Sequence, residues 1–232
     1  MDRCTEEQNN LRFFVAVLLH LVLGSCAYQT AQGGDIIIIG DSVPAWNRGE
    51  DSDVGSVIAS ELSRNVVNRA AFGAQIRAND LASLVGLSIP DQLLPGQWNW
   101  VIANGAANDL GFSCGCTRCD QVINELISRD SKSGAIPGLI DEAQARGARV
   151  IWLGYYEAPE TTSFEGCRPG LVEIERRIEL LARSNPGLFF LDAEDAFDPP
   201  VRELFDPDRT HPSTKGSALI GKEIASIIEK ES

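Results

Sequence analysis

The sequence is poor in basic residues. Its 232 residues include 20 Lys and Arg against 33 Asp and Glu, which gives a formal net charge of −13. Proteins that bind nucleic acids normally carry a basic surface, so this balance argues against a nucleic-acid partner. The acidity favours solubility and identifies no substrate. With 44% hydrophobic residues, the chain is long enough for one α/β domain with a substantial core and too short for two.

The longest apolar run near the N-terminus is too short to cross a bilayer. It extends over the eleven residues from Phe13 to Leu23, whereas a membrane-spanning helix needs about 20. A run of this length followed by small residues is typical of a signal peptide. We therefore expect residues 1–27 to be a signal peptide. The segment from Leu23 to Cys26 also resembles a bacterial lipobox, in which Cys26 becomes the lipidated first residue.

Two alternatives to a lipobox remain for this segment. Cleavage after Ala27 would release a protein without a lipid, and a buried N-terminal helix would leave the segment in place. Asp2, Glu6 and Glu7 make it less basic than most signal peptides. We expect an exported protein that is periplasmic, secreted or anchored to a membrane through Cys26.

Cysteines are few but clustered. Cys114, Cys116, Cys119 and Cys167 follow the predicted leader. In an oxidising compartment four thiols predict two disulfides, for which three connectivities are possible. A zinc site built on Cys-x-Cys-x-x-Cys is the alternative.

Short apolar runs alternate with helical periodicity along residues 35–232, which we take as one domain. The apolar runs are residues 35–40, 65–68, 98–103, 149–154 and 188–192, and the helical patterns are residues 53–64, 74–85, 120–129, 136–146, 170–183 and 213–230. This alternation predicts an α/β fold, a three-layer α/β/α sandwich around a flavodoxin-like parallel five-stranded sheet. Functional residues should then lie at the carboxyl ends of the strands. Residues 155–168 have no clear pattern and are expected to form a surface loop.

Histidine is the scarcest candidate for acid–base chemistry. The chain has two, and His20 falls in the predicted leader, so His211 is the histidine left to act as a base near neutral pH. Asp208 precedes it by three residues on a turn between Pro207 and Pro212. Such a turn can place the carboxylate against the imidazole and fix its tautomer.

Polar residues and glycines follow three of the predicted strands. Ser42 comes directly after the first strand, Gly73 follows the second and Asn108 follows the third. Backbone N–H groups at Ser42 and Gly73, with the side-chain amide of Asn108, could form an oxyanion hole. Taken singly, each residue is more often a cap or a turn former than a catalytic group. Their common position at strand ends favours catalysis.

The order of these segments resembles the sequence blocks of the SGNH (GDSL-type) hydrolases. The matching residues are Gly40-Asp41-Ser42, Gly73, Asn108-Asp109 and Asp208-x-x-His211. The resemblance implies that Ser42 is the nucleophile, that His211 is its base held by Asp208, and that Ser42, Gly73 and Asn108 bind the oxyanion. It also implies the flavodoxin-like sandwich. One position departs from the family pattern, since Ala106 stands where the third block usually has glycine.

The predicted function is a serine esterase that hydrolyses carboxylic esters through an acyl-enzyme, with no metal or organic cofactor. The substrate is a small-molecule, glycan or lipid ester, and Trp46 is a candidate for the pocket wall or the core. The alternatives are an acyltransferase or thioesterase at the same site, or a non-catalytic envelope module that binds glycan or lipid. A competing Gly-x-Ser-x-Gly match at Ser113 lacks the preceding strand that a nucleophile elbow requires.

Overall fold

The computed structural model describes residues 34–158, 164 and 166–232. These described residues belong to one compact unit. The predicted leader and Cys26 lie outside the described residues. In the part of the chain that the structure describes, no helix has the length and apolarity needed to cross a membrane.

The five predicted strands are all present and form one parallel sheet. They are β1 (Ile36–Ile39), β2 (Val66–Asn68), β3 (Trp100–Ala103), β4 (Arg149–Leu153) and β5 (Leu188–Leu191), in the order β2-β1-β3-β4-β5. The four isoleucines of β1 are fully buried. A strand that is apolar on both faces needs cover on both faces, and this accounts for a central position in a parallel sheet.

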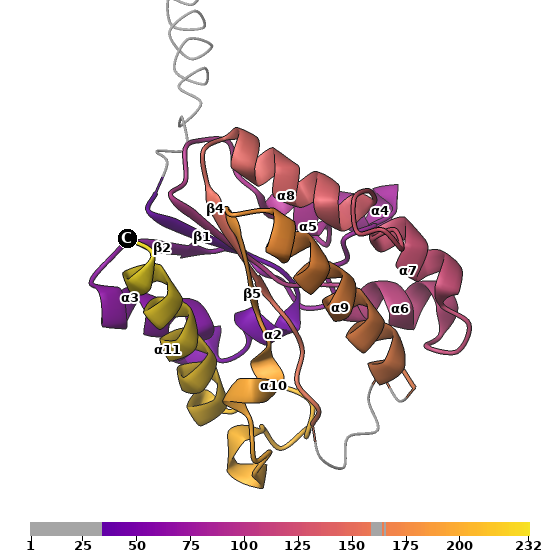
Figure 1. The fold of residues 1–232 in the computed structure, drawn as a ribbon. Coiled ribbons are helices and arrows are strands. Elements are labelled where there is room, and N and C mark those ends of the chain that lie inside the picture. Colours follow the sequence, from indigo (N-terminus) through magenta and orange to yellow (C-terminus); the bar gives the residue numbers. More distant parts are fainter. Residues whose placement is uncertain (1–33, 159–163, 165) are drawn as a thin grey trace, which may run out of the picture. The chain divides into compact units, whose positions relative to one another are not determined.

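Helices cover both faces of the sheet (Figure 1). Helices α3 (Val54–Leu62) and α11 (Thr214–Lys230) pack against each other on one face, and α8 (Ala135–Ala145) and α9 (Arg168–Ser184) cover the other. The remaining helices are α2 (Ser42–Ala45), α4 (Asp80–Leu84), α5 (Ile89–Gln92), α6 (Ala107–Cys114), α7 (Asp120–Leu126) and α10 (Ala193–Ala196). The predicted three-layer α/β/α sandwich is confirmed.

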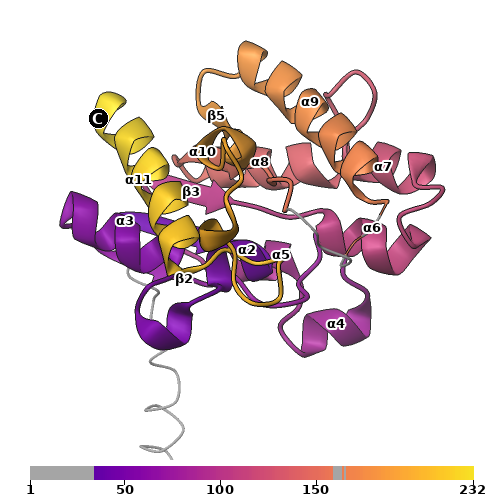
Figure 2. The same cartoon turned by 90° about the horizontal axis from the view of Figure 1, so that it is seen from below.

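The connections out of β1 and β3 leave the sheet in opposite directions. From β1 the chain passes through α3 to β2, and from β3 it passes through α8 to β4, on the other side of β1. The view in Figure 2 shows α2 between the pair α3 and α11 and the helices of the other face, with α6 beside α7. Divergent connections of this kind leave a crevice at the carboxyl ends of the two strands.

The predicted helix at residues 74–85 is wrong over its first half. Only Asp80–Leu84 is helical, and Asn79 caps it by accepting a hydrogen bond from the backbone N–H of Ala82. Before that cap, the N–H groups of Ile76 and Arg77 donate to the carboxylate of Asp109. Those amides are therefore bound to another segment, and buried Ala74 and Ile76 pack in the core without a helix.

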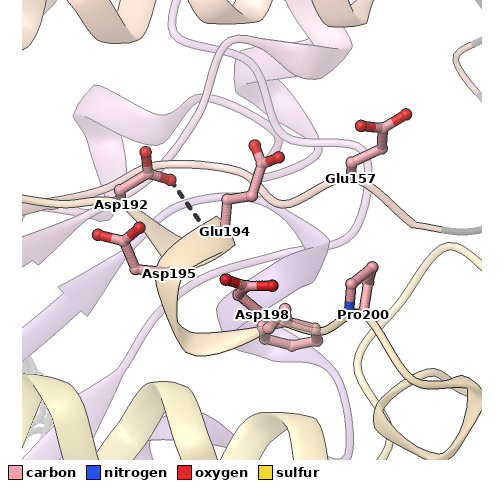
Figure 3. Close-up of a pocket in the computed structure, with 7 residues that line it drawn as sticks. Glu157, Asp192, Glu194, Asp195, Asp198 and Pro200 are labelled. Carbon is pink, nitrogen blue, oxygen red and sulfur yellow. Dashed lines mark hydrogen bonds between the residues drawn. The ribbon is translucent and has the colours of Figure 1, made fainter.

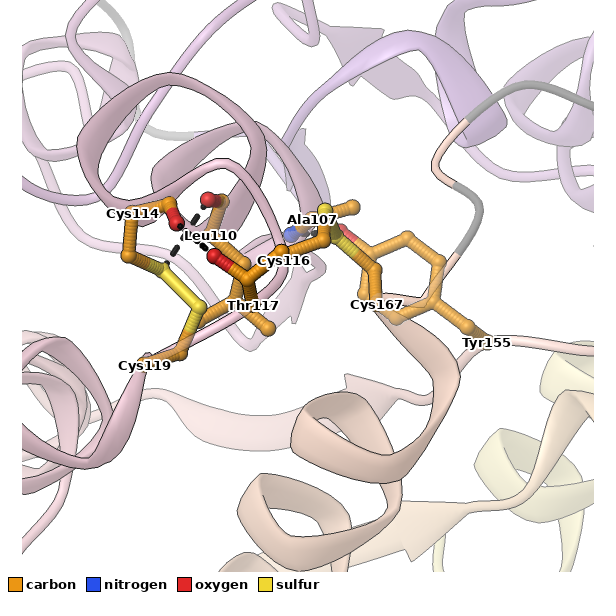
Figure 4. The surroundings of a disulfide bond; sticks show 8 residues. All are labelled: Ala107, Leu110, Cys114, Cys116, Thr117, Cys119, Tyr155 and Cys167. Atoms are coloured by element: carbon orange, nitrogen blue, oxygen red, sulfur yellow. Dashed lines mark hydrogen bonds between the residues drawn. A yellow bond between two sulfur atoms is a disulfide. The ribbon is translucent and has the colours of Figure 1, made fainter.

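The four described cysteines form two disulfides. Cys114 pairs with Cys119, and Cys116 pairs with Cys167 (Figure 4). This pairing selects one of the three connectivities and leaves none of the four thiols for a zinc site. The second bridge joins the segment after α6 to the residue before α9.

Candidate active site

Three side chains from distant parts of the chain meet at the carboxyl edge of the sheet. The Nε2 atom of His211 lies 2.7 Å from Oγ of Ser42, and its Nδ1 atom lies 2.5 Å from Oδ2 of Asp208. Ser42 begins α2 directly after β1. A hydroxyl, an imidazole and a carboxylate joined in this order form the arrangement of a Ser-His-Asp triad.

Asp208 is fixed by its own turn as well as by the imidazole. Its Oδ1 atom accepts hydrogen bonds from the backbone N–H groups of Thr210 (2.9 Å) and His211 (3.0 Å). Burial opposes ionisation of this carboxyl, but the bonds from the His211 ring and from the two N–H groups outweigh it. Together they hold the pKa of Asp208 below its usual value. Asp208 is therefore a carboxylate wherever His211 would act as a base.

Trp46 lies against the histidine and is neither core nor cavity wall. Its ring stacks on the imidazole of His211, with centroids 3.7 Å apart and planes 3° from parallel. Its Nε1 atom donates to Oδ2 of Asp206 at 3.1 Å, and the ring of Phe72 packs against the indole with the centroids 5.1 Å apart. The half-buried indole thus limits the tilt of the imidazole.

The loop that carries Ser42 is held by the side chains of Gln92 and Tyr155, which lie outside the predicted motifs. The side-chain amide of Gln92 accepts from the N–H of Gly40 (2.7 Å) and donates to its carbonyl oxygen (3.1 Å). The carboxylate of Asp41 accepts from the N–H of Val43 and from the hydroxyl of Tyr155. No sequence pattern indicated Gln92. The sequence predicts a surface loop at Tyr155, although its position just after β4 could have indicated that it belongs to the site.

The structure brings together only in part the three residues that are predicted to form the oxyanion hole. Asn108 lines the same cavity as Ser42 and His211, and its side-chain NH2 donates one hydrogen bond to the carbonyl of Ala74 at 3.0 Å. An amide NH2 has a second hydrogen to offer. Gly73 does not line the cavity, but it precedes Ala74 and has a left-handed φ of +77°. The contact between Asn108 and Ala74 therefore places the two predicted donors on adjoining segments.

A cavity of about 300 Å³ opens beside the triad. Its wall is formed mainly by apolar and aromatic side chains, which include Val43, Ala107, Tyr155, Tyr156, Ala158, Phe164 and Leu171. Tyr155 and Tyr156 are both 8% exposed. The predicted loop at residues 155–168 is thus wrong at its start, where two tyrosines are packed into the interior. Pockets of this size and polarity bind small organic groups.

A second cavity, of about 510 Å³, adjoins the first and shares Glu157 with it. Its carboxylates, seen in Figure 3, are Glu157, Asp192, Glu194, Asp195 and Asp198. Burial and the neighbouring Asp195 raise the pKa of Asp192, although Arg168 opposes the shift. This side of the site therefore has a negative potential.

The model of the GDSL-like lipase/acylhydrolase family matches residues 38–219. The chain belongs to this family. The matched span contains Ser42, Gly73, Asn108, Asp208 and His211. No curated protein matches the chain significantly.

Solved structures with the same fold share little sequence with this family member. A protein from Slackia heliotrinireducens described as an SGNH hydrolase superposes with a TM-score of 0.60 at 16% identity, over 84% of this chain and 99% of its own. For a catalytic mutant of an acetylxylan esterase from Geobacillus stearothermophilus the TM-score is 0.57, at 18% identity, over 84% and 94%. For a lipase from a goat rumen metagenome it is 0.54, at 17% identity, over 83% and 96%. The predicted SGNH hydrolase fold is confirmed.

Ser113 is a residue of α6 and is exposed, and no strand precedes it directly. The Gly-x-Ser-x-Gly match around it is therefore not a nucleophile elbow.

Ala106 adopts a backbone conformation that suits glycine. Its φ is +118° and its ψ is −26°, and it is fully buried at the start of α6. A non-glycine residue in a sparsely populated region costs about 1–3 kcal/mol. The family's usual glycine at this position would avoid that cost.

We expect Ala106→Gly to make the protein more stable. Relief of strain should exceed two opposing effects, which are the loss of a buried methyl group and the larger conformational entropy that glycine gives the unfolded chain. The free energy of unfolding should therefore rise by about 0.5–1 kcal/mol. For a domain of this size the midpoint of thermal unfolding should rise by about 1–4 °C. Calorimetry measures the shift. A lower midpoint would show that the methyl group contributes more than the strain costs.

Asp109 is a buried carboxyl that holds the Ile76 segment. It is 1% exposed and accepts the N–H of Ile76 at 3.0 Å and that of Arg77 at 2.8 Å. Burial raises the pKa of Asp109 to about 6, although both backbone hydrogen bonds favour the ionised form.

The raised pKa of Asp109 predicts a pH-dependent stability. The folded protein binds this proton more tightly than the unfolded chain, so the contribution of Asp109 to stability falls as the pH rises from 3.8 to about 6. Urea unfolding across this range should give a steeper decline for the wild type than for Asp109→Asn. Asp141→Asn, an exposed change on α8, should keep the wild-type slope. Equal slopes for all three proteins would contradict the shift.

Proposed function

We propose that the protein is a serine esterase that hydrolyses carboxylic esters through an acyl-enzyme intermediate. The observation that supports this most directly is the hydrogen-bonded series from Ser42 through His211 to Asp208. Membership of a lipase/acylhydrolase family agrees with the same class of chemistry.

The proposed reaction has two steps that use the same groups. His211 takes the proton of Ser42 as the hydroxyl oxygen attacks the ester carbonyl, and Asp208 stabilises the resulting imidazolium. The oxyanion accepts hydrogen bonds from the N–H groups of Ser42 and Gly73 and from the amide of Asn108. His211 then protonates the leaving alkoxide. Water repeats the sequence at the acyl-enzyme and releases the acid.

The surroundings of Ser42 favour a neutral substrate. The cavity beside the nucleophile is mainly apolar and suits an acyl group. The neighbouring carboxylates of Glu157, Asp192 and Asp195 repel a phosphate or carboxylate group on the substrate. Arg168 also lines the cavity, but its guanidinium forms ion pairs with two glutamates, Glu175 and Glu194.

The decisive experiment compares the wild type with Ser42→Ala on a panel of p-nitrophenyl, aryl acetate, acetylated sugar, lysophospholipid and thioester substrates. We expect hydrolysis of neutral esters by the wild type and a loss of at least about 10⁴-fold in Ser42→Ala, since the triad acts as a unit. A fluorophosphonate should label Ser42 alone. Labelling of another serine, or equal activity of the two proteins, would contradict the assignment. Preference for an alcohol acceptor over water would instead indicate an acyltransferase.

We also propose that the protein is exported after removal of residues 1–27 or of the residues before Cys26. The two disulfides of the described part support an oxidising compartment. Mass spectrometry of the protein from its native host tests this. A diacylated Cys26 at the mature N-terminus would establish anchoring, and a free N-terminus further along the chain would establish release. Retention of Met1 would contradict export.

A further inference from the structure

Tyr155 joins two parts of the site that are distant from each other in the sequence. Its hydroxyl donates to Oδ2 of Asp41 at 2.5 Å and accepts from the backbone N–H of Ala107 at 3.1 Å. Figure 4 shows the second of these bonds beside the disulfide from Cys116 to Cys167. One phenol oxygen therefore binds the loop after β1 and the first residue of α6.

Both partners of this hydroxyl are immediate neighbours of residues proposed to act in catalysis. Asp41 precedes Ser42, and Ala107 precedes Asn108. The phenol thus lies between the segment that carries the nucleophile and the segment that carries the oxyanion donor. The two hydrogen bonds of its oxygen fix the distance between those segments.

The protonation of this pair is settled by burial and by charge. Burial raises the pKa of Tyr155 well above its usual value, and the charge of Asp41 raises it further. Burial likewise raises the pKa of Asp41, while the bond from Tyr155 opposes that shift. The phenol therefore keeps its proton, and because its oxygen already accepts from Ala107, that proton is directed at Asp41.

The backbone of Tyr155 is anchored from the opposite side. Its N–H donates to Oε1 of Glu175 at 2.6 Å, and Oε2 of Glu175 accepts from Arg168 at 3.1 Å. Both residues belong to α9, and Glu175 is 7% exposed. A buried carboxylate that meets a backbone N–H and a guanidinium is costly to displace. The phenol is thus held at a fixed position relative to α9.

We propose that Tyr155 is a positioning residue that keeps Ser42 and Asn108 at the separation needed for attack and for oxyanion binding. It acts through Asp41 and Ala107 and exchanges no proton with the substrate. The inference rests on the proposed esterase function. Misplacement of reacting groups by about 1 Å can cost about 10² in rate, which sets the scale of the effect.

The first test is Tyr155→Phe, which keeps the ring and removes the oxygen. We expect kcat for a short neutral ester to fall about 10²-fold, with KM unchanged because the pocket wall is retained. The rate of fluorophosphonate labelling at Ser42 should fall by a similar factor. If Tyr155→Phe instead raises KM and leaves kcat unchanged, the proposal is overturned and Tyr155 is a substrate-contact residue.

Trp98→Phe is the comparison for the loss of an aromatic donor away from the site. Trp98 is 3% exposed, and its Nε1 atom donates to the carbonyl oxygen of Leu94 at 3.1 Å. Neither residue lines the cavity beside Ser42. Loss of this neutral hydrogen bond should change kcat by less than about fivefold. Equal losses of kcat in the two variants would show that general destabilisation, and not the link to Asp41 and Ala107, sets the rate.

Asp41→Asn tests the same link from its other end and serves if Tyr155→Phe does not fold. The amide has one acceptor oxygen and cannot accept from both the N–H of Val43 and the hydroxyl of Tyr155. The kcat should therefore fall again while KM is kept. The double variant should be no slower than the slower single variant, because both changes remove one contact. Fully multiplicative losses, or an unchanged kcat in Asp41→Asn, would overturn the proposal. If the wild type neither hydrolyses esters nor reacts with the fluorophosphonate, the esterase function itself fails.

Discussion

Backbone hydrogen bonding between parallel strands is the constraint on which the site depends. The register of β1 against β3 and of β3 against β4 places the ends of these strands at one edge. Gly40, Asn104 and Gly154 follow those ends, so the segments that carry Ser42, Asn108 and Tyr155 begin next to one another. Catalytic geometry at this edge requires only short loops, because the sheet already brings the segments together.

Buried polar groups do most of the finer positioning. Asp41, Asp109 and Glu175 are nearly inaccessible to water, yet each accepts hydrogen bonds from a backbone N–H of another segment or of its own turn. A carboxylate in such a place is tolerated only when its oxygens are bound. The cost of burial therefore disfavours loop arrangements that leave these oxygens without donors.

Sequence reasoning succeeded where a local pattern determines structure. The isoleucine run of β1 and the apolar runs of the other strands predicted the sheet, and strand ends then predicted that Ser42 and Asn108 lie close together. It failed where a contact with a residue distant in the sequence determines the local structure. The amides of Ile76 and Arg77 are bound by Asp109, 33 and 32 residues away, and this removed part of a predicted helix. The role of Gln92, the inward packing of Tyr155 and Tyr156, and the pairing of Cys116 with Cys167 likewise depend on tertiary contacts that spacing does not encode.

The single turn of α2 carries the nucleophile at one end and the indole that backs the base at the other. The N–H of Trp46 donates to the carbonyl oxygen of Ser42 at 2.9 Å, and the indole stacks on His211. When this turn shifts as a rigid body, the serine and the surface that supports the imidazole travel together. Thermal motion of the turn therefore changes the alignment of hydroxyl and ring less than an independent movement of Ser42 would, and the site tolerates small displacements of its own scaffold.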